Sequence, residues 1–396
     1  MNRLFYYLGL LLFILTNNFS NAQSGWSLQT NPLGSGENAI LGKVQFVSLT
    51  EGWISGGRGD FLHTTDAGTN WEVVTPFPDD TVWCSSDPSV SMSWVNSTHG
   101  WKINSFGPDY GISYGVVIHR TTDGGSTWMK DVLSTVDGDF GFQIQFVDIN
   151  TGWLLYFNFS TQVATFLKTT DGGNNWDPFN GAGIFFFVDS DNGWSYYGSG
   201  PNGSDPPYKI LSTTNGGTDW TEQFTDNNVG GYNAMFFSDL QNGWIVGDNG
   251  KVLKTTNGGI VWSYITNSGI NADERSKTVF FLDANTGWIS SKSDNNAAFI
   301  QHTTDGGASW TTQGGIPDND PDDGNSIYWD AYRIAKKRCG NLKLPVISES
   351  ASFAFREAFQ AAFVFIGDRR FVGLCNGFHP QQIRSPIGRE AQIARE

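Results

Sequence analysis

Loop carboxylates that stand near aromatic side chains are the residues of this sequence best suited to chemistry. Two carboxyl groups roughly 5–10 Å apart can hydrolyse a glycosidic bond, one as a general acid and the other as a base or nucleophile. Aromatic rings beside such a pair could stack on sugar rings. The candidates fall in links between predicted strands, where they would share one ligand face, and they are Asp109, Tyr110, Asp139, Tyr197, Asp205, Tyr208, Tyr232 and Asp248. The sequence leaves open whether two of these acids converge, and the alternative is that they are solvated loop acids.

Composition argues against several other kinds of site. The 396 residues include three cysteines and no Cys-x-x-Cys pair, so neither a disulfide framework nor a cysteine zinc site is expected. No nucleophile elbow, phosphate loop or dinucleotide fingerprint occurs in the sequence. We therefore predict no cofactor and no metal ion, and we assign no catalytic residue. The net charge of −15 argues against nucleic acid as a partner.

One repeat accounts for most of the chain. An aromatic residue followed six positions later by Gly-Trp occurs six times, at Phe46/Gly52-Trp53, Trp94/Gly100-Trp101, Phe146/Gly152-Trp153, Phe187/Gly193-Trp194, Phe237/Gly243-Trp244 and Phe281/Gly287-Trp288. Successive copies lie 41 to 52 residues apart, which fits the period of a four-stranded propeller blade.

Each repeat is long enough for four short strands. In the first copy we expect them at Lys43–Val47, Gly52–Ser55, Phe61–Thr65 and Trp71–Thr75, because apolar and β-branched runs there are separated by Gly, Asp and Asn. Residues 40–316 show no sustained helical periodicity. The predicted fold is therefore an all-β propeller with six complete blades.

A second motif, Thr-Thr-(Asp/Asn)-x-Gly-x-x-Trp, follows each Gly-Trp. Its acid or amide, which we call the cap, its glycine and its tryptophan are Asp66, Gly68, Trp71; Asp123, Gly125, Trp128; Asp171, Gly173, Trp176; Asn215, Gly217, Trp220; Asn257, Gly259, Trp262; and Asp305, Gly307, Trp310.

The residue types of this second motif predict a structural role. A cap side chain can accept hydrogen bonds from backbone N–H groups further along a tight turn. Two copies use Asn215 and Asn257, so the carboxylate charge is dispensable and a catalytic acid is not expected there. The glycine two positions after the cap occurs in every copy, whereas the position before it accepts Ala67. We therefore expect a positive φ at the glycine and not at the position before it.

The paired motifs resemble Asp-box (BNR) repeats, and over residues 25–316 the chain is similar to the photosystem II stability/assembly-factor propellers, many relatives of which are secreted bacterial proteins. This resemblance implies a non-enzymatic protein-binding or assembly role. The photosynthetic members are basic on their binding face, whereas residues 1–322 here hold 13 basic and 32 acidic residues, so their particular partner is not expected. Asp-box propellers also include xyloglucan-active glycosidases, which keeps hydrolysis as an alternative.

The two ends of the chain differ from the repeats. Residues 1–22 are predicted to be a signal peptide, because the apolar run from 4 to 15 is too short to span a membrane and Ser20-Asn21-Ala22 offers a cleavage site. Residues 23–322 are assigned to the propeller. Residues 323–396 carry eight of the twelve arginines and neither motif. We interpret this basic tail as frame-shifted or disordered, with a genuine extension as the alternative.

The N-terminal strand predicts how the ring closes. Gly25-Trp26 looks like the strand that follows a second motif, but no such motif precedes it. Because the sixth repeat already has its own outer strand after Trp310, the strand at Trp26 is predicted to close an incomplete seventh blade that begins near Asn325.

The sequence thus predicts a bacterial propeller that is secreted, periplasmic or held at the cell surface, with no transmembrane span in the mature chain. Its expected work is to bind a protein or a glycan. The alternatives are a glycoside hydrolase that uses two loop carboxylates and a purely structural surface module.

Overall fold

The computed structural model describes most of the repeat region. The described residues are Pro32 and the ranges 41–56, 61–74, 91–106, 115–158, 160–181, 183–199, 205–266, 268–271, 274–293 and 298–313. The predicted signal peptide, the strand at Trp26, the seventh blade and the tail 323–396 all lie outside these ranges.

The described residues form six antiparallel sheets of four strands each, which we number as blades in chain order. The strands of the first three blades are β1 (Leu41–Phe46), β2 (Gly52–Gly56), β3 (Phe61–Thr64) and β4 (Glu72–Val74); β5 (Met92–Trp94), β6 (Gly100–Phe106), β7 (Gly115–Thr121) and β8 (Met129–Ser134); and β9 (Asp139–Phe146), β10 (Gly152–Asn158), β11 (Val163–Thr169) and β12 (Asp177–Pro178).

The strands of the last three blades are β13 (Ile184–Phe187), β14 (Gly193–Ser199), β15 (Asp205–Thr213) and β16 (Thr221–Asp226); β17 (Tyr232–Phe237), β18 (Gly243–Gly247), β19 (Val252–Thr255) and β20 (Ser263–Tyr264); and β21 (Glu274–Phe281), β22 (Gly287–Ser293), β23 (Ala298–Thr303) and β24 (Thr311–Thr312).

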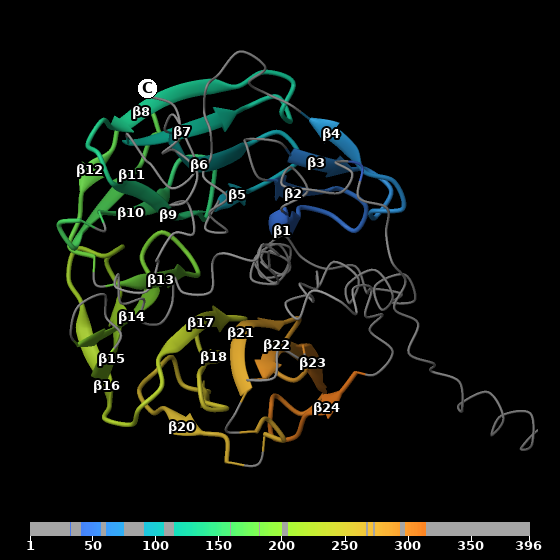
Figure 1. The fold of residues 1–396 in the computed structure, drawn as a ribbon, viewed down its shortest axis with the longest axis vertical. Coiled ribbons are helices and arrows are strands. Elements are labelled where there is room, and N and C mark those ends of the chain that lie inside the picture. Colours follow the sequence, from blue (N-terminus) through green and yellow to red (C-terminus); the bar gives the residue numbers. More distant parts are fainter. Residues whose placement is uncertain are drawn as a thin grey trace, which may run out of the picture.

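Within every blade the strands pair in sequence order, so each sheet is a simple meander. Figure 1 shows the blades following one another around a ring, with the first strand of each blade towards the middle and the fourth towards the outside. The predicted all-β propeller with six four-stranded blades is confirmed.

The register of the first hairpin explains the spacing of the Gly-Trp motif. In every blade the aromatic residue that ends the first strand pairs with the glycine that begins the second, as in Phe46↔Gly52 and Phe146↔Gly152. The ring of the aromatic residue lies over that glycine. A Cβ on Gly152 would come within 2.6 Å of the Phe146 ring, and the same approach recurs in all six copies. The six-residue spacing therefore places a residue without a side chain under each ring.

The tryptophan of the motif joins each blade to the next. Its indole stacks face to face on the first-strand aromatic ring of the following blade, with centroid distances of 3.5 to 3.8 Å. The stacked pairs are Trp53–Trp94, Trp101–Phe146, Trp153–Phe187, Trp194–Phe237 and Trp244–Phe281. Five successive contacts between blades are thus built from the same two residues, which we call the interblade stack.

A hydrogen bond fixes four of these indoles. Trp153 Nε1 donates to Gly216 O at 3.1 Å, and Trp244 Nε1 donates to Gly306 O at 3.0 Å. Trp101 and Trp194 make the same bond to the following blade. Each acceptor is the residue directly after the cap of the second motif, so that motif also contributes to the contact between blades.

The second-motif tryptophan completes the environment of the aromatic ring. It meets the first-strand ring of its own blade edge to face, at centroid distances of 5.8 to 6.1 Å in all six blades. Trp128 also stacks on Phe61 of the preceding blade at 5.0 Å. These tryptophans therefore pack against the first hairpin of their own blade, and Trp128 also packs against the preceding blade.

The last Gly-Trp marks where a further blade would join. Among the described residues, the rings nearest Trp288 are Phe280 and His302, and both belong to its own blade. The aromatic residue of a following blade would come from the predicted seventh blade, which is not among them.

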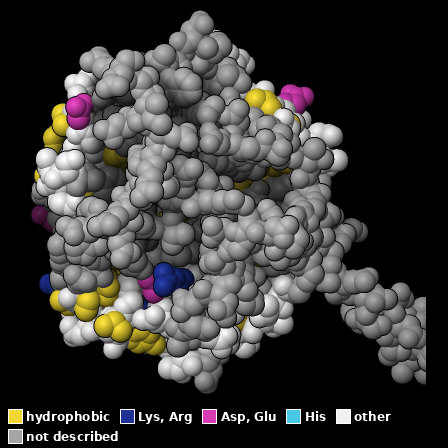
Figure 2. All heavy atoms as spheres, viewed as in Figure 1, with side chains coloured by type: hydrophobic (Ala, Val, Ile, Leu, Met, Phe, Trp, Pro, Cys, Tyr) yellow, Lys and Arg dark blue, Asp and Glu magenta, His cyan; other side chains and the backbone are white. Residues whose placement is uncertain are grey.

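Over the fourth and fifth blades, Figure 2 shows hydrophobic side chains at the surface beside a small group of basic and acidic ones.

Replacing Gly152 tests the register. We expect Gly152→Ala to lower the free energy of unfolding by about 1–3 kcal/mol, because the new methyl group would overlap the Phe146 ring. The midpoint of urea unfolding measures this change. Val163→Thr, on the exposed side of the same blade, is the control, and its effect should stay within about 0.5 kcal/mol. A Gly152→Ala protein as stable as the wild type would show that the ring does not require glycine.

Candidate functional site

The second motif closes a turn at one end of every blade. In the second blade, Thr127 N donates to Asp123 Oδ1 at 2.9 Å, and the Thr121 hydroxyl donates to the same oxygen at 2.8 Å. Gly125 N donates to Thr121 Oγ1 at 2.9 Å. The other five copies repeat this pattern. We call this turn the box.

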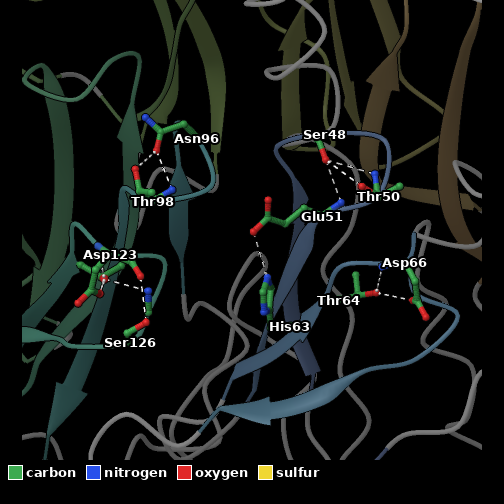
Figure 3. A network of polar contacts seen from close by, with 12 residues as sticks. Ser48, Thr50, Glu51, His63, Thr64, Asp66, Asn96, Thr98, Asp123 and Ser126 are labelled. Atoms are coloured by element: carbon green, nitrogen blue, oxygen red, sulfur yellow. Dashed lines mark hydrogen bonds and ion pairs between the residues drawn. The ribbon is translucent and has the colours of Figure 1, made fainter.

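Each box is tied to the first hairpin turn of its own blade. Ala67 N donates to Thr50 O at 2.8 Å, and Gly124 N donates to Thr98 O at 2.9 Å, with the same bond in the other four blades. Figure 3 shows the box and the hairpin turn close together in the first two blades. The boxes and the first hairpin turns therefore share one end of the ring, which we call the box end.

The expected backbone conformation of the box was wrong at one position. Both residues after the cap have a positive φ in every copy, including Ala67 at 58° and Gly68 at 72°. Ala67 showed that a side chain is accepted there, but not that φ is negative. An L residue can adopt the left-handed conformation at a cost of about 1 kcal/mol or more, and the first box bears that cost.

A pairing four residues along was not recognised in the sequence. In four boxes a side-chain donor reaches the second oxygen of an aspartate cap, as in Asn175 Nδ2 to Asp171 Oδ2 at 2.7 Å. In the fourth blade the pair is reversed, and Asn215 Nδ2 donates to Asp219 Oδ2 at 2.9 Å. In each of these five boxes, one of the two side chains donates the hydrogen bond and the other accepts it. The constant spacing of four residues was the sequence signal that could have revealed this pairing.

These hydrogen bonds lower the pKa of the acidic caps. The side-chain and backbone donors of Thr127 hold the pKa of Asp123 at about 2. The equivalent bonds from Asn175 and Ser309 lower the pKa of Asp171 and Asp305 to about 2. A lowered pKa contributes stability above the unfolded value near 3.9, and that stability is lost as the pH falls towards 2. An acid ionised at neutral pH and saturated with donors does not suit general acid catalysis.

The opposite end of the ring, which we call the loop end, carries the candidate ligand residues. Asp139 begins β9 and is buried. Ser134 Oγ donates to Asp139 Oδ2, and Asn158 Nδ2 donates to Asp139 Oδ1 at 2.7 Å. This carboxylate therefore joins the end of β8 in the second blade to the β10–β11 hairpin of the third blade.

A buried ion pair lies at the loop end of the fifth blade. Lys251 Nζ is 2.8 Å from Asp226 Oδ2, and their side chains are only 7% and 1% exposed. The ammonium also donates to Asn228 O at 2.9 Å and Gly230 O at 2.6 Å. Burial pushes the pKa of Asp226 up, but the hydrogen bonds from Lys251 and other donors outweigh burial and leave the pKa below its ordinary value. The pair fixes the link between β16 and β17 to the β18–β19 hairpin.

Tyrosines enclose this pair. Tyr232 donates its hydroxyl to Asp226 Oδ2 at 2.9 Å. The Lys251 ammonium lies 5.0 Å and 5.3 Å from the ring centroids of Tyr208 and Tyr232. Asn228 Nδ2 donates to Tyr264 Oη at 3.1 Å, and burial raises the pKa of Tyr264 to about 12. The phenols are therefore neutral at physiological pH.

The candidate ligand residues predicted from the sequence differ in burial and in their contacts. It brings together Tyr208 and Tyr232, both buried, at a centroid distance of 5.5 Å. Asp248 is buried and accepts from Asn233 Nδ2 at 2.9 Å. Tyr197 is 36% exposed, and Asp205 is the first residue of β15. Asp109 and Tyr110 lie outside the described residues.

Lys251 was not recognised as a functional candidate in the sequence, because a lysine in a Gly-rich turn looks like an ordinary surface residue. The fourth copy also has a lysine, Lys209, at the equivalent position six residues before its cap, so the residue type alone does not single Lys251 out. Within the described ranges, no three His, Cys, Asp or Glu side chains are grouped so that they could hold a metal ion. In the same ranges, no helix has the length and apolarity needed to cross a membrane.

Comparison with known proteins gives two sequence matches. A family model described as photosynthesis system II assembly factor YCF48 matches residues 219–316. The chloroplast photosystem II stability/assembly factor HCF136 of Oryza sativa subsp. japonica is 23% identical over 302 residues, which cover 68% of this chain and 70% of that protein.

Solved structures share the fold at low sequence identity. YCF48 bound to D1 peptide aligns with a TM-score of 0.51 and 19% identity, over 69% of this chain and 80% of that one. YCF48 from Cyanidioschyzon merolae aligns with a TM-score of 0.50 and 20% identity, over 70% and 85%. The GH74 enzyme of Niastella koreensis aligns with a TM-score of 0.52 and 16% identity, over 69% of this chain but 46% of the enzyme. At such identities these structures show the fold alone.

The donor–acceptor rule of the boxes can be tested in the fourth blade. We expect Asn215→Asp to lower the free energy of unfolding by about 1 kcal/mol at neutral pH, because the new carboxylate would face Asp219. Lowering the pH below about 4 should relieve this repulsion. The double variant Asn215→Asp/Asp219→Asn recreates the pair of the third box and should recover the stability. Thermal unfolding across pH measures both effects, and a double variant no better than the single one would disprove the rule.

The buried ion pair should contribute more to stability than an exposed ion pair with a similar N–O distance. We expect Lys251→Met to lower the free energy of unfolding by roughly 3–5 kcal/mol, because it leaves Asp226 buried without its counter-ion. Lys209 lies 2.6 Å from Glu222, but both side chains are about one third or more exposed. Lys209→Met is therefore the control and should change stability little. Equal losses in urea unfolding of the two variants would contradict this ranking.

Proposed function

We propose that this chain, an Asp-box β-propeller similar to the photosystem II stability/assembly-factor propellers, is an exported protein-binding module without enzymatic activity. Its ring acts as a rigid support, and its loop end offers variable links to a partner. The boxes hold the blades closed and take no part in binding at that end.

Protein binding is the role that the named relatives favour. The rice relative is called a stability/assembly factor, and one solved YCF48 structure is bound to a D1 peptide. Both descriptions concern proteins that act on other proteins. We extend this class of partner to the present chain because of the resemblance. We do not extend the particular partner, because this chain is strongly acidic.

The single observation that carries the proposal is the state of the loop-end carboxylates. The three buried ones are bound by neighbouring donors: Asp139 by Ser134 and Asn158, and Asp226 by Lys251 and Tyr232. Asp248 likewise accepts from Asn233. A glycosidase needs one carboxyl group that can be protonated and a second that is open to the sugar or to water. These acids instead position links, which suits a binding surface.

Export from a bacterium is part of the proposal and rests on the N-terminal sequence. The apolar run ends before Ser20-Asn21-Ala22, and cleavage there would leave Gln23 as the first residue. Fractionation of the producing cells, followed by N-terminal sequencing of the protein, would test export. Protein that stays inside the cell with Met1 intact would refute it.

The binding role can be separated from catalysis by assaying both on one preparation. We expect purified wild-type protein to release no reducing sugar from xyloglucan above the buffer rate, while a protein from the producing cells co-purifies with it in constant proportion. Asp139→Asn should leave co-purification within about threefold of the wild type, since its oxygen still accepts from a loop donor.

Asp137→Asn is the matched control, since Asp137 is exposed in the same link. Sugar release by the wild type that Asp139→Asn abolishes and Asp137→Asn preserves would establish hydrolysis and overturn the proposal. The absence of any constant partner would also count against it.

A further inference from the structure

The box of the fifth blade differs from the other five. The two residues before its tryptophan are Ile260 and Val261, which are 77% and 56% exposed. The corresponding pairs elsewhere contain no large apolar residue, and they are Thr69-Asn70, Ser126-Thr127, Asn174-Asn175, Thr218-Asp219 and Ala308-Ser309. The fifth box therefore presents two aliphatic side chains to solvent where the others present polar or small ones.

The turn itself does not need these two side chains. Val261 N donates to Asn257 Oδ1 at 2.9 Å, and Gly259 N donates to Thr255 Oγ1 at 2.8 Å, as in the other boxes. Both bonds are donated by backbone N–H groups, so the side chains of Ile260 and Val261 take no part in them. Valine cannot make the side-chain bond that pairs cap and partner in the other five boxes, so the fifth box has lost one hydrogen bond and gained exposed apolar surface.

A third aliphatic residue lies at the same end of this blade. Leu240 is 42% exposed and belongs to the first hairpin turn. Gly258 N donates to Gln241 O at 2.9 Å, which joins this turn to the box. The blades on either side have Ser190 and Ala284 at the equivalent turn position. Leu240, Ile260 and Val261 thus form a group at the box end of the fifth blade, which we call the aliphatic tip.

Acidic side chains lie at the box end of the fifth blade and of the two blades beside it. Asp239 stands directly before Leu240 and caps the same turn. The neighbouring blades contribute Asp219 from the fourth box and Asp283 and Asp305 from the sixth blade, all of them exposed. Indole hydrogen bonds from Trp194 to the fifth box and from Trp244 to the sixth hold these three blades together. The Lys254 ammonium lies beside Asp305, so the surface has an apolar centre with a rim of four carboxylates and one ammonium, which is negative overall.

We propose that the aliphatic tip is a second docking surface, which takes a polypeptide segment with apolar side chains flanked by Lys or Arg. Exposed apolar groups rimmed by polar residues mark interaction sites, and opposite charge at a rim steers and orients the partner. Anionic lipid headgroups would be repelled by the acidic rim, and aliphatic side chains offer no ring on which a sugar can stack. The assignment rests on the proposed protein-binding role and adds a binding face opposite the loop end.

The test uses a variant that restores the common box sequence. Ile260→Thr/Val261→Asn gives the fifth box the two residues that precede the tryptophan in the first, so the fold and the net charge should be preserved and the melting temperature should not fall. The matched control is Val132→Thr/Val163→Thr, which removes two apolar groups, 55% and 54% exposed, from β8 and β11 of other blades. The probe is a short fluorescent peptide of leucine and lysine, and a leucine and glutamate peptide is its counterpart.

We expect the leucine and lysine peptide to bind the wild type and the control equally, and the restored-box variant at least about tenfold more weakly. Added NaCl should weaken binding, and the glutamate peptide should not bind. Equal binding to the wild type and the restored-box variant would overturn the site while leaving the protein-binding role intact. No binding to the wild type would also overturn it, and the co-purification assay above would then decide whether the broader role survives.

Discussion

The stack of an indole on the first-strand aromatic ring of the next blade is the contact on which the rest of the ring depends. One face of each ring is covered by this indole, its edge meets the box tryptophan of its own blade, and the glycine of the first hairpin lies beneath it. The contacts of this ring therefore account for the six-residue spacing of the Gly-Trp motif and for the tryptophan of the box. Because the indole N–H of four tryptophans is bonded to a box carbonyl, the box is as much a contact between blades as a turn.

The repeat predicted the architecture well because the interblade stack leaves a strict pattern in the chain. The expected strands of the first blade differ from the observed ones by one or two residues at an end, as in Lys43–Val47 against Leu41–Phe46. The conformation at Ala67 was mispredicted because a side chain at one position says nothing about the sign of φ when the cost is small. The pair of Lys251 and Asp226 could not be foreseen, since it depends on how the end of the fourth blade meets a hairpin of the fifth blade in space.

Charge is used differently at the two ends of the ring. At the loop end, Asp139, Asp226 and Asp248 are buried and bound by neighbouring residues, so they shape the surface without being open to a ligand. At the box end, the aspartate caps Asp123, Asp171 and Asp305 are ionised, and their hydrogen bonds hold turns closed. The fifth box stands apart from both, because it gives up a bond and exposes aliphatic side chains. A protein of net charge −15 thus retains local surfaces that can meet an apolar partner.

Hydrogen exchange of the tryptophan indole N–H protons, followed by NMR, tests most directly whether the interblade stack holds the ring. The indoles of Trp101, Trp153, Trp194 and Trp244 should exchange only through global unfolding, with a protection free energy equal to the stability measured by denaturant. Exchange of these four protons at much lower free energies than the slowest backbone amides would mean that the blades separate without unfolding. In that case the contact described here would not be what keeps the ring together.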